Sequence, residues 1–331
     1  MVMKMIYKYC SPDILDLIFA KSGLVRLRCT YPRDFNDPFE LFLTIDTRKL
    51  PRKYFAFYNE VLGQIPLLPT TCFSHRPDII PMWAHYGLNS TGFVLEIDEN
   101  RLQKSFPDGK VEKVNYDTTP FTITKNDLAY AYEIAKPRHT YFLLQDAINN
   151  DYLRKNACWS YEEERRLVVT KKDVVNENGL MILEVPAGCV RAIISGSSSS
   201  DTIVEHCIGL CKKYDYQHYQ MRLGRGSLTP FFIASRFKYR RGKAARKHTS
   251  KSTSGSTYSY VFKKNAFERV NYRCALCGEP IRTRSTAKCN WCSLTKAQAQ
   301  KAAVRNPFRM LEQLGMLESY IEMHNRVSKK K

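Results

Sequence analysis

Nine residues in the middle of the chain, WSYEEERRL at 159–167, bring together the side chains best placed to do chemistry. The apolar run that follows the charged residues predicts a strand entered at about Tyr161. Because alternate residues of a strand share a face, Glu162, Glu164 and Arg166 should point the same way. Two carboxylates beside a fixed guanidinium suit a site that stabilises developing positive charge or accepts a proton.

The same nine residues also have a purely structural interpretation. In a helical turn, Glu162 and Arg166 would lie four residues apart and form an ordinary surface ion pair. The choice between the two interpretations depends on the elements and motifs elsewhere in the chain.

The composition describes a globular protein with an uneven distribution of charge. The chain has 331 residues, is 44% hydrophobic and is long enough for two domains. It has no apolar run that could span a membrane and no secretory leader, so we expect a cytoplasmic protein. Residues 1–215 contain 27 Lys and Arg and 27 Asp and Glu, whereas residues 216–331 contain 25 Lys and Arg and 5 Glu. The net charge of +20 therefore lies in the last third, as expected for a segment that binds a polyanion.

Two C-x-x-C pairs form the most specific chemical motif. They are Cys274 with Cys277 and Cys289 with Cys292, and a glycine follows the first pair. Two thiolates in one tight knuckle can bind the same metal ion, and two knuckles complete a tetrahedral site with four sulfur ligands. Such a site has no open position, so we expect a structural zinc ion; a disulfide or a redox pair is the alternative.

Short strands and helices mix along residues 1–235 without strict β–α–β alternation, which predicts an α+β domain with mixed or antiparallel sheets. We expect strands at 6–9, 24–29, 70–73, 91–98, 180–185 and 190–194, and helices from Ser11 to Gly23, at 79–86, at about 126–155 with a break near Pro137, and at 201–213.

The last third differs in composition from the rest of the chain. Eight Lys and Arg in 236–251 precede a Ser/Thr/Gly stretch, so residues 236–260 should form a basic, flexible linker. The zinc-binding module would then occupy 261–331, together with a basic helical tail that is interrupted at Pro307.

Six motifs of the first domain occur in an order that resembles a known family. They are Tyr7-Lys8-Tyr9, FNDPFE at 35–40, Phe73-Ser74, MWAHY at 82–86, the strand that starts at Gly92, and W-x-x-E-x-E-x-R at 159–166. Over about residues 5–225 the chain resembles the bacterial domain-of-unknown-function family numbered 2971. The zinc module lies outside this resemblance, and the family name carries no activity.

A second resemblance suggests an activity. A strand, a helix and a strand at the start, an aromatic strand-to-helix segment, and a late strand headed by glutamate are similar to the plan of the ADP-ribosyltransferases. This resemblance implies that NAD is the substrate and that Glu164, with Glu162 beside it, bonds the nicotinamide ribose. It assigns NAD binding to Lys8, Tyr9, Asn36, Ser74, Trp83 and Tyr86. The chain departs from the superfamily at Lys8, where His or Arg is usual, and it has no STS triplet after Phe73.

Taken together, these patterns predict an NAD-dependent ADP-ribosyltransferase that its basic segment 236–331 delivers to DNA or RNA, as in a toxin or a phage-defence effector. Arg166 would hold the carboxylates or pair with pyrophosphate. Tyr239, Tyr258, Tyr260 and Trp291 are available to stack on exposed bases.

Two other functions are compatible with the sequence. One is a non-enzymatic nucleic-acid-binding zinc protein in which the acidic strand is a salt-bridge network. The other is a nucleotide-processing hydrolase that uses the same carboxylates with a divalent ion. Consumption of NAD separates the transferase from the first alternative, and metal dependence separates it from the second.

Overall fold

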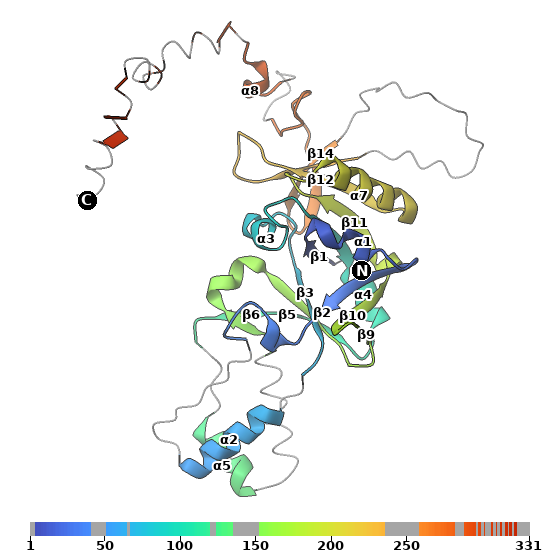
Figure 1. Cartoon of the computed structure of the whole chain (residues 1–331), viewed down its shortest axis with the longest axis vertical. Helices are drawn as coiled ribbons and strands as arrows, with labels where there is room; N and C mark the ends of the chain where they lie inside the picture. Colours follow the sequence, from blue (N-terminus) through green and yellow to red (C-terminus); the bar gives the residue numbers. More distant parts are fainter. Residues whose placement is uncertain are drawn as a thin grey trace. The chain divides into compact units, whose positions relative to one another are not determined.

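The computed structural model describes residues 4–40, 51–64, 67–119, 124–134, 152–235, 258–281 and 288–295, with single residues between 297 and 322. The chain divides into two compact units, Met1–Arg269 and Val270–Lys331 (Figure 1). Residues 236–257, where the sequence predicts a linker, lie outside the described residues, and so do Pro137 and Pro307. The expected start of the zinc module at residue 261 falls inside a strand of the first unit, so the second unit begins later than the composition suggested.

A ten-stranded, mostly antiparallel sheet forms the centre of the first unit, in the order β15-β14-β13-β12-β11-β4-β1-β3-β8-β5. Strands β11 and β12 run parallel, and helix α7 (Asp201–Tyr214) connects them. The mixed sheet confirms the α+β class predicted from the sequence. Its strands are β1 (Met5–Cys10), β3 (Thr70–Ser74), β4 (Phe93–Asp98), β5 (Lys110–Lys113), β8 (Glu164–Val168), β11 (Val190–Ser195), β12 (Gln217–Arg222), β13 (Phe231–Ala234), β14 (Tyr258–Lys263) and β15 (Ala266–Arg269).

A three-stranded sheet shares an apolar core with one face of the large sheet. It consists of β2 (Leu24–Cys29), β10 (Leu180–Pro186) and β9 (Val174–Glu177), in that order. Alternation along β2 and β10 sends Val25 and Leu183 inward, where they join Leu95 of β4 and Cys207 of α7 in one buried cluster. Helix α4 (Glu99–Ser105) contributes Leu102 to the same core.

The opposite face of the large sheet carries an aromatic cluster. Tyr7 and Tyr9 are two residues apart in β1 and therefore share this face, where they pack with Phe262 of β14. Helix α3 (Ile80–His85) covers the cluster with Trp83, whose ring meets Tyr9 edge-on at 5.3 Å between centroids. The Trp83 indole donates a hydrogen bond to the carbonyl of Pro77 over 2.7 Å, which satisfies its only polar group.

Strand β1 pairs very differently with its two neighbours. Its six residues all pair with β4, whereas Tyr7 opposite Ser74 is its one described pair with β3. Close contact with β4 requires a glycine at residue 92, because a Cβ there would lie 2.1 Å from the Cys10 carbonyl oxygen. The sheet is therefore tightly joined on one side of β1 and opens on the other.

The charged segment of the opening motif does not form one continuous strand. Residues Ala157–Glu162 form a 3₁₀ helix (η4), and the backbone of Glu163 is left-handed with φ 44°. Strand β8 begins at Glu164, so the strand predicted from about Tyr161 starts later than expected. The first helix is also shorter than expected, with a 3₁₀ turn at Pro12–Ile14 (η1) before α1 at Leu15–Ile18.

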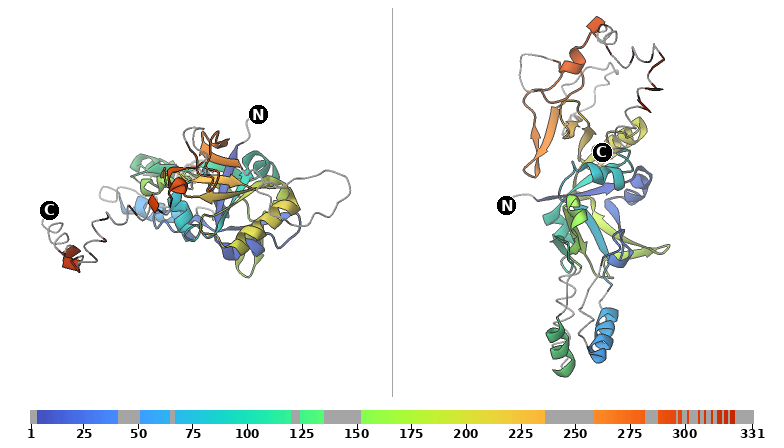
Figure 2. Two further views of the ribbon diagram at one scale, coloured as in Figure 1. Left: turned by 90° about the horizontal axis from the view of Figure 1, so that it is seen from above. Right: turned by 90° about the vertical axis from the view of Figure 1, so that its left-hand side faces the viewer.

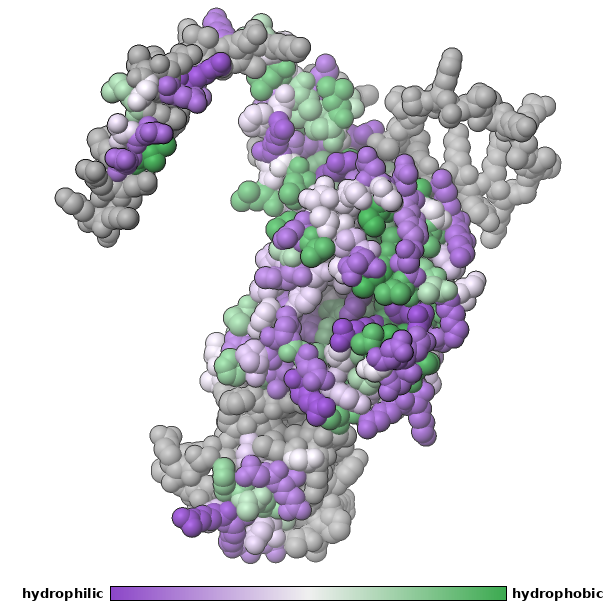
Figure 3. Space-filling model, in the orientation of Figure 1, coloured by the Kyte–Doolittle hydropathy of each residue, from purple (hydrophilic) through white to green (hydrophobic). Residues whose placement is uncertain are grey.

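The remaining elements of the first unit are short. Helices α2 (Arg52–Gln64) and α5 (Lys125–Ile134) lie side by side (Figure 2), where Tyr54 and Tyr132 meet edge-on at 5.4 Å. Strands β6 (Asn115–Asp117) and β7 (Arg154–Asn156) form a parallel pair, and two 3₁₀ turns lie at Pro32–Asp34 (η2) and Ala187–Cys189 (η5). Figure 3 shows mainly hydrophilic residues on one face of this unit, with hydrophobic residues in separate patches.

Candidate functional site

The three consecutive glutamates point in different directions. The left-handed backbone at Glu163 turns that side chain away, and it pairs with Arg76 at 3.2 Å while remaining 41% exposed. Glu162 and Glu164 are buried, each with 3% of its side chain exposed. The backbone turn therefore separates one surface carboxylate from two internal ones, and only the internal pair can form a site.

Arg166 anchors Glu164 from behind. The two residues share one face of β8, and Arg166 Nε donates to Glu164 Oε1 over 2.8 Å. The same guanidinium binds Glu40 with two hydrogen bonds, of 2.6 and 2.9 Å, and donates to the Tyr152 carbonyl over 2.8 Å. Arg166 is fully buried, and the ring of Phe35 lies 5.1 Å from it. This two-pronged pairing fixes both carboxylates in space.

Lys155 of β7 joins the two internal glutamates from the side. Its Nζ lies 2.6 Å from Glu162 Oε2 and 3.1 Å from Glu164 Oε2, and 3% of the side chain is exposed. The ring of Trp159 packs against this ammonium at 5.0 Å. Lys155 was not among the site residues predicted from the sequence, because nothing in the polar stretch around it indicates which charged side chains it will contact.

These side chains form a buried network of three carboxylates and two cations. Burial opposes ionisation of Glu164, but Arg166 and Lys155 outweigh it and lower the pKa of that carboxyl to about 2. Burial also opposes the charge on Lys155, yet Glu164 and Glu162 raise its pKa above the ordinary lysine value. At Glu40 burial prevails over Arg166, so the pKa of that carboxyl is raised. Glu164 is therefore a fixed negative charge at neutral pH.

Tyr86 and Asn36 connect Glu162 to the open side of the site. The Tyr86 hydroxyl donates to Glu162 Oε1 over 2.7 Å and accepts a hydrogen bond from Asn36 Nδ2 over 2.9 Å. Burial and the Glu162 carboxylate raise the pKa of Tyr86, so its hydroxyl remains a donor. Asn36 is exposed at this point, which makes the tyrosine the boundary between the network and solvent.

Ser74 and Lys8 lie where β1 and β3 diverge. The Ser74 hydroxyl donates to the carbonyl of Glu162 over 2.7 Å and accepts from the backbone N–H of Arg76. Lys8 Nζ reaches across to β3, where it donates to the Cys72 carbonyl over 2.8 Å and to Thr71 Oγ1 over 3.1 Å. The lysine thus satisfies backbone that β1 leaves unpaired, and it places a positive charge at the opening between the strands.

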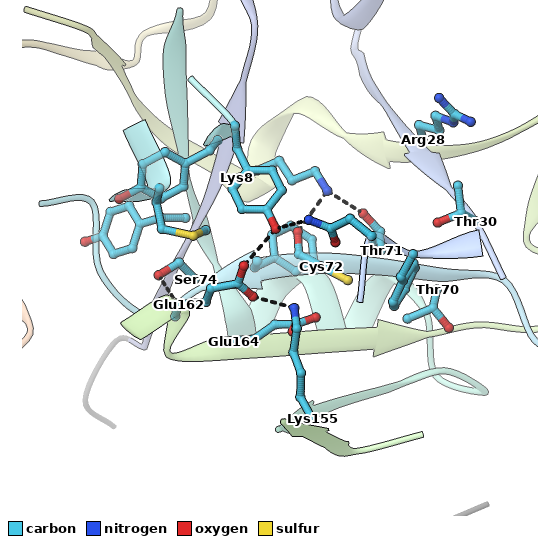
Figure 4. Close-up of a pocket in the computed structure, with 17 residues that line it drawn as sticks. Lys8, Arg28, Thr30, Thr70, Thr71, Cys72, Ser74, Lys155, Glu162 and Glu164 are labelled. Atoms are coloured by element: carbon cyan, nitrogen blue, oxygen red, sulfur yellow. Dashed lines mark hydrogen bonds and ion pairs between the residues drawn. The ribbon is translucent and has the colours of Figure 1, made fainter. Parts of the chain in front are cut away.

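A pocket of about 170 Å³ opens at this divergence (Figure 4). Seven of the residues that the sequence assigned to a site line it, and they come from β1, the turn after η2, β3, the end of α3, η4 and β8. They are Lys8, Tyr9, Asn36, Ser74, Tyr86, Glu162 and Glu164. Two other assigned residues, Arg166 and Trp83, lie behind the wall, the first in the ion network and the second in the aromatic cluster.

The rest of the pocket wall was not anticipated from the sequence. It includes Lys155, exposed Arg28 of β2, the hydroxyls of Thr30 and Thr71, and the rings of Phe35 and Phe73. In the sequence, Arg26 and Arg28 alternate with apolar residues along this strand. What the alternation did not reveal is that β2 brings Arg28 to the same pocket as the carboxylates of β8.

The second unit contains a compact cluster of four cysteines. The Sγ atoms of Cys274, Cys277, Cys289 and Cys292 all lie within 4.8 Å of one another, and Cys277 Sγ is 3.7 Å from Cys289 Sγ. Tetrahedral zinc–thiolate bonds of about 2.3 Å place sulfur atoms about 3.8 Å apart, so the cluster fits a structural metal ion such as zinc. Among the described residues of this unit, the only buried side chains are Cys274, Glu279 and Cys289.

The backbone around the cysteines forms two knuckles. In the first, the Gly278 N–H donates to the Cys274 carbonyl over 3.0 Å, with φ +77° at Gly278. In the second, Cys289 caps the short helix α8 (Asn290–Ser293), and its sulfur accepts from the Cys292 N–H over 3.4 Å. Burial disfavours the Cys274 thiolate, but backbone N–H groups outweigh it and lower its pKa to about 6, whereas hydrogen bonds to neighbouring thiols raise the pKa of Cys292 to about 12. Four thiolates this close together would repel one another, and a bound cation such as zinc would offset that repulsion.

Comparisons with known proteins give one match, to a family model. No helix in the described part of the chain is long and apolar enough to cross a membrane. No curated protein and no solved structure matches the chain. A family model described as "Protein of unknown function (DUF2971)" matches residues 82–167, a segment that carries Tyr86, Lys155, Glu162 and Glu164 and supports the family resemblance seen in the sequence.

Proposed function

We propose that the chain is an NAD-using ADP-ribosyltransferase that cleaves the nicotinamide–ribose bond in the pocket between β1 and β3. The observation that carries the proposal is the convergence of Lys8, Ser74, Tyr86 and Glu164 in one pocket. These residues are spread over more than 150 positions of sequence, and the superfamily plan assigns each of them to NAD. A structural salt-bridge network accounts for Glu164 but not for the presence of Lys8, Ser74 and Tyr86 in the same cavity.

The distribution of charge in the pocket suits an oxidised dinucleotide. Lys8 and Arg28 provide positive charge, while Glu162 and Glu164 provide negative charge in the same cavity. NAD combines a cationic nicotinamide ring with an anionic pyrophosphate, so it complements both kinds of group. Tyr86 and the Phe35 ring offer flat surfaces for nicotinamide. A pocket of about 170 Å³ accommodates only part of a dinucleotide, with the rest extending outward.

The state of Glu164 suits the bond cleavage. As the bond between ribose C1′ and the nicotinamide nitrogen breaks, its electron pair leaves with nicotinamide and cancels the charge of the ring. The ribose becomes oxocarbenium-like, and an acceptor nucleophile then bonds to C1′ and gives up its proton. With a pKa of about 2, Glu164 is a fixed charge that stabilises the cationic sugar rather than a proton acceptor. Glu162, nearer Tyr86, is placed to orient the ribose or the acceptor.

The hydrolase alternative is less compatible with this geometry. A divalent ion shared by Glu162 and Glu164 would have to lie between them, and Lys155 Nζ already occupies that place at 2.6 and 3.1 Å. In our proposal the basic last third delivers the enzyme to nucleic acid through residues 236–331, which hold 23 of the 25 Lys and Arg of residues 216–331.

The proposal is tested by measuring nicotinamide release when the purified chain is incubated with NAD and with protein, DNA or RNA as acceptors. Glu164→Gln should lower the rate by about 100-fold or more, because a charged contact to the transition state is lost. Glu162→Gln should also lower it. The matched control is Glu163→Gln, which changes the neighbouring glutamate on the surface and should leave the rate within about two-fold.

Circular dichroism of each variant establishes that the fold is kept, since Glu164 has two buried cationic partners. Absence of NAD turnover with all three acceptor classes would refute the transferase proposal and favour a non-enzymatic protein. Turnover that chelators abolish would favour the metal-dependent hydrolase.

A further inference from the structure

Each cysteine knuckle of the second unit presents one large apolar side chain to solvent. Leu276 and Trp291 occupy the same place in the two motifs, directly before the second cysteine of Cys274-Ala-Leu-Cys277 and of Cys289-Asn-Trp-Cys292. Leu276 is 66% exposed and Trp291 is 52% exposed. Exposure of large apolar residues at both equivalent positions is a feature that a structural metal site does not itself require.

The knuckles hold these two side chains at fixed positions. Four sulfur atoms within 4.8 Å occupy the inside of the unit, so the residues between the cysteines must face outward. The Gly278 N–H to Cys274 carbonyl bond closes the first knuckle, and the Ser293 N–H to Cys289 carbonyl bond closes the second. Leu276 and Trp291 are therefore displayed on short, hydrogen-bonded turns joined through one cluster, which lowers the entropy lost on binding.

The charge around the knuckles is strongly positive. Residues 270–331 contain 12 Lys and Arg against 4 Glu, a net charge of +8. Arg273 directly precedes the first knuckle, and exposed Lys288 directly precedes the second. A partner that binds the apolar side chains must therefore tolerate or supply negative charge at the same place. A phosphate backbone does so, and its bases have flat faces that pack on apolar and aromatic groups.

We propose that Leu276 and Trp291 form a base-stacking surface for single-stranded nucleic acid, with the neighbouring cations on its phosphates. The surface is defined by these two side chains and is called the knuckle tips below. Duplexes hide the faces of their bases, so the knuckle tips discriminate in favour of unpaired strands. This inference rests on the nucleic-acid delivery in the proposed function and names the form of nucleic acid that is bound.

The other aromatic candidates from the sequence are less suited to stacking. Tyr260 is half-buried in β14, and its ring meets Tyr219 edge-on at 5.6 Å. Arg269 lies 3.5 Å over the ring of Tyr258, on the neighbouring strand. Tyr239 lies outside the described residues. Of the described candidates, Trp291 is the most exposed residue, at 52%.

The test compares a twelve-nucleotide oligothymidylate with an abasic strand of the same length and charge, using fluorescence anisotropy and the full-length, zinc-loaded chain. If one base stacks on the knuckle tips, the oligothymidylate should bind about 5- to 150-fold more tightly. Trp291→Ala and Leu276→Ala should reduce that ratio and leave affinity for the abasic strand unchanged. Leu223→Ala is the matched control, because Leu223 is 60% exposed in the first unit.

A spectroscopic readout separates stacking from loss of fold. Oligothymidylate should quench tryptophan fluorescence of the wild type, and Trp291→Phe should remove that quenching while keeping most of the affinity and one metal ion per chain. Equal affinity for both strands in the wild type, with no effect of Trp291→Ala, would overturn the inference but leave charge-driven delivery intact; the knuckle tips would then face a protein. Binding of neither strand at low salt would refute delivery as well as the inference.

Discussion

The buried ion network of the first unit and the cysteine cluster of the second unit each hold several anionic side chains close together. The positive charge that balances these anions comes from a different source in each unit. Around Glu40, Glu162 and Glu164 the cations belong to the chain, as Arg166 and Lys155. Around the four cysteines the sulfur geometry fits a bound metal ion, which would supply the positive charge. The first arrangement depends on long-range folding, and the second depends on the supply of an ion.

A third region contains a buried carboxyl that has no ion-pair partner among the described residues. Glu96 of β4 is 9% exposed, and its contact is a hydrogen bond of 3.1 Å from the Tyr7 hydroxyl. No ion pair among the described residues includes it, and burial raises its pKa to about 7. Glu164 is also buried but has two cations beside it, and its pKa is about 2. The two cations, which Glu96 lacks as ion-pair partners, therefore account for the opposite directions of the two pKa shifts.

Removal of the metal should have the largest effect, because the described residues of the second unit bury few side chains besides those of the cysteines. We expect one zinc ion per chain, and chelation should unfold residues 270–331 at a cost on the order of 10 kcal/mol while the first unit stays folded. Elemental analysis and circular dichroism with and without chelator measure this. Cys277→Ser should lower the metal content, whereas Cys158→Ser, at an exposed cysteine of the first unit, should not. Unchanged metal content in Cys277→Ser would contradict the assignment.

Removal of the Arg166 guanidinium should have the second-largest effect on stability. Arg166→Met leaves Glu40 and Glu164 buried without their main partner, so the free energy of unfolding should fall by about 3–5 kcal/mol. Arg165→Met is the matched control in the adjacent position. Arg165 pairs with Glu99 and is 15% exposed, so its loss should cost about 1 kcal/mol. Urea denaturation of both variants makes the comparison, and equal losses would show that the network adds nothing special.

Sequence reasoning succeeded where a local pattern determines the outcome. Alternation located β1, β2 and β4, and the paired C-x-x-C spacing located the cysteine cluster, since both depend on residues that are close in sequence. It failed where local backbone overrides the pattern. Glu163 adopts a left-handed conformation, which starts β8 late and sends one glutamate outward. No residue type near it signals that turn.

The partners of the charged groups could not be predicted from the sequence, for a different reason. Arg166 pairs with Glu40 across 126 positions, and Lys155 meets the glutamates only because β7 and η4 fold back on β8. The last two strands were overlooked because a basic segment separates them from the domain they complete. Long-range pairing of this kind is decided by the packing of the whole sheet and leaves no periodic trace in the sequence.

The smallest expected effect concerns the buried carboxyl that has no cation. The folded chain keeps the Glu96 proton up to about pH 7, whereas an unfolded chain releases it near the ordinary glutamate pKa of 4.5. Between these values the folded state binds more protons, so this group's contribution to stability is complete below pH 4.5 and is lost as pH rises through 7. The shift is worth roughly 3 kcal/mol. Glu96→Gln cannot ionise, so relative to wild type it should gain about that much stability between pH 5 and pH 8.

Urea denaturation of wild type and Glu96→Gln at the two pH values measures this difference. His218, whose pKa burial lowers to about 4, makes stability fall as pH decreases below about 6.5, but it does so in both proteins and cancels. Glu163→Gln, at a side chain that is 41% exposed, should show the same difference from wild type at both pH values. If Glu96→Gln also shows no change between pH 5 and pH 8, the carboxyl is not held neutral by burial, and the dependence of these buried anions on their cations is weaker than the contrast with Glu164 implies.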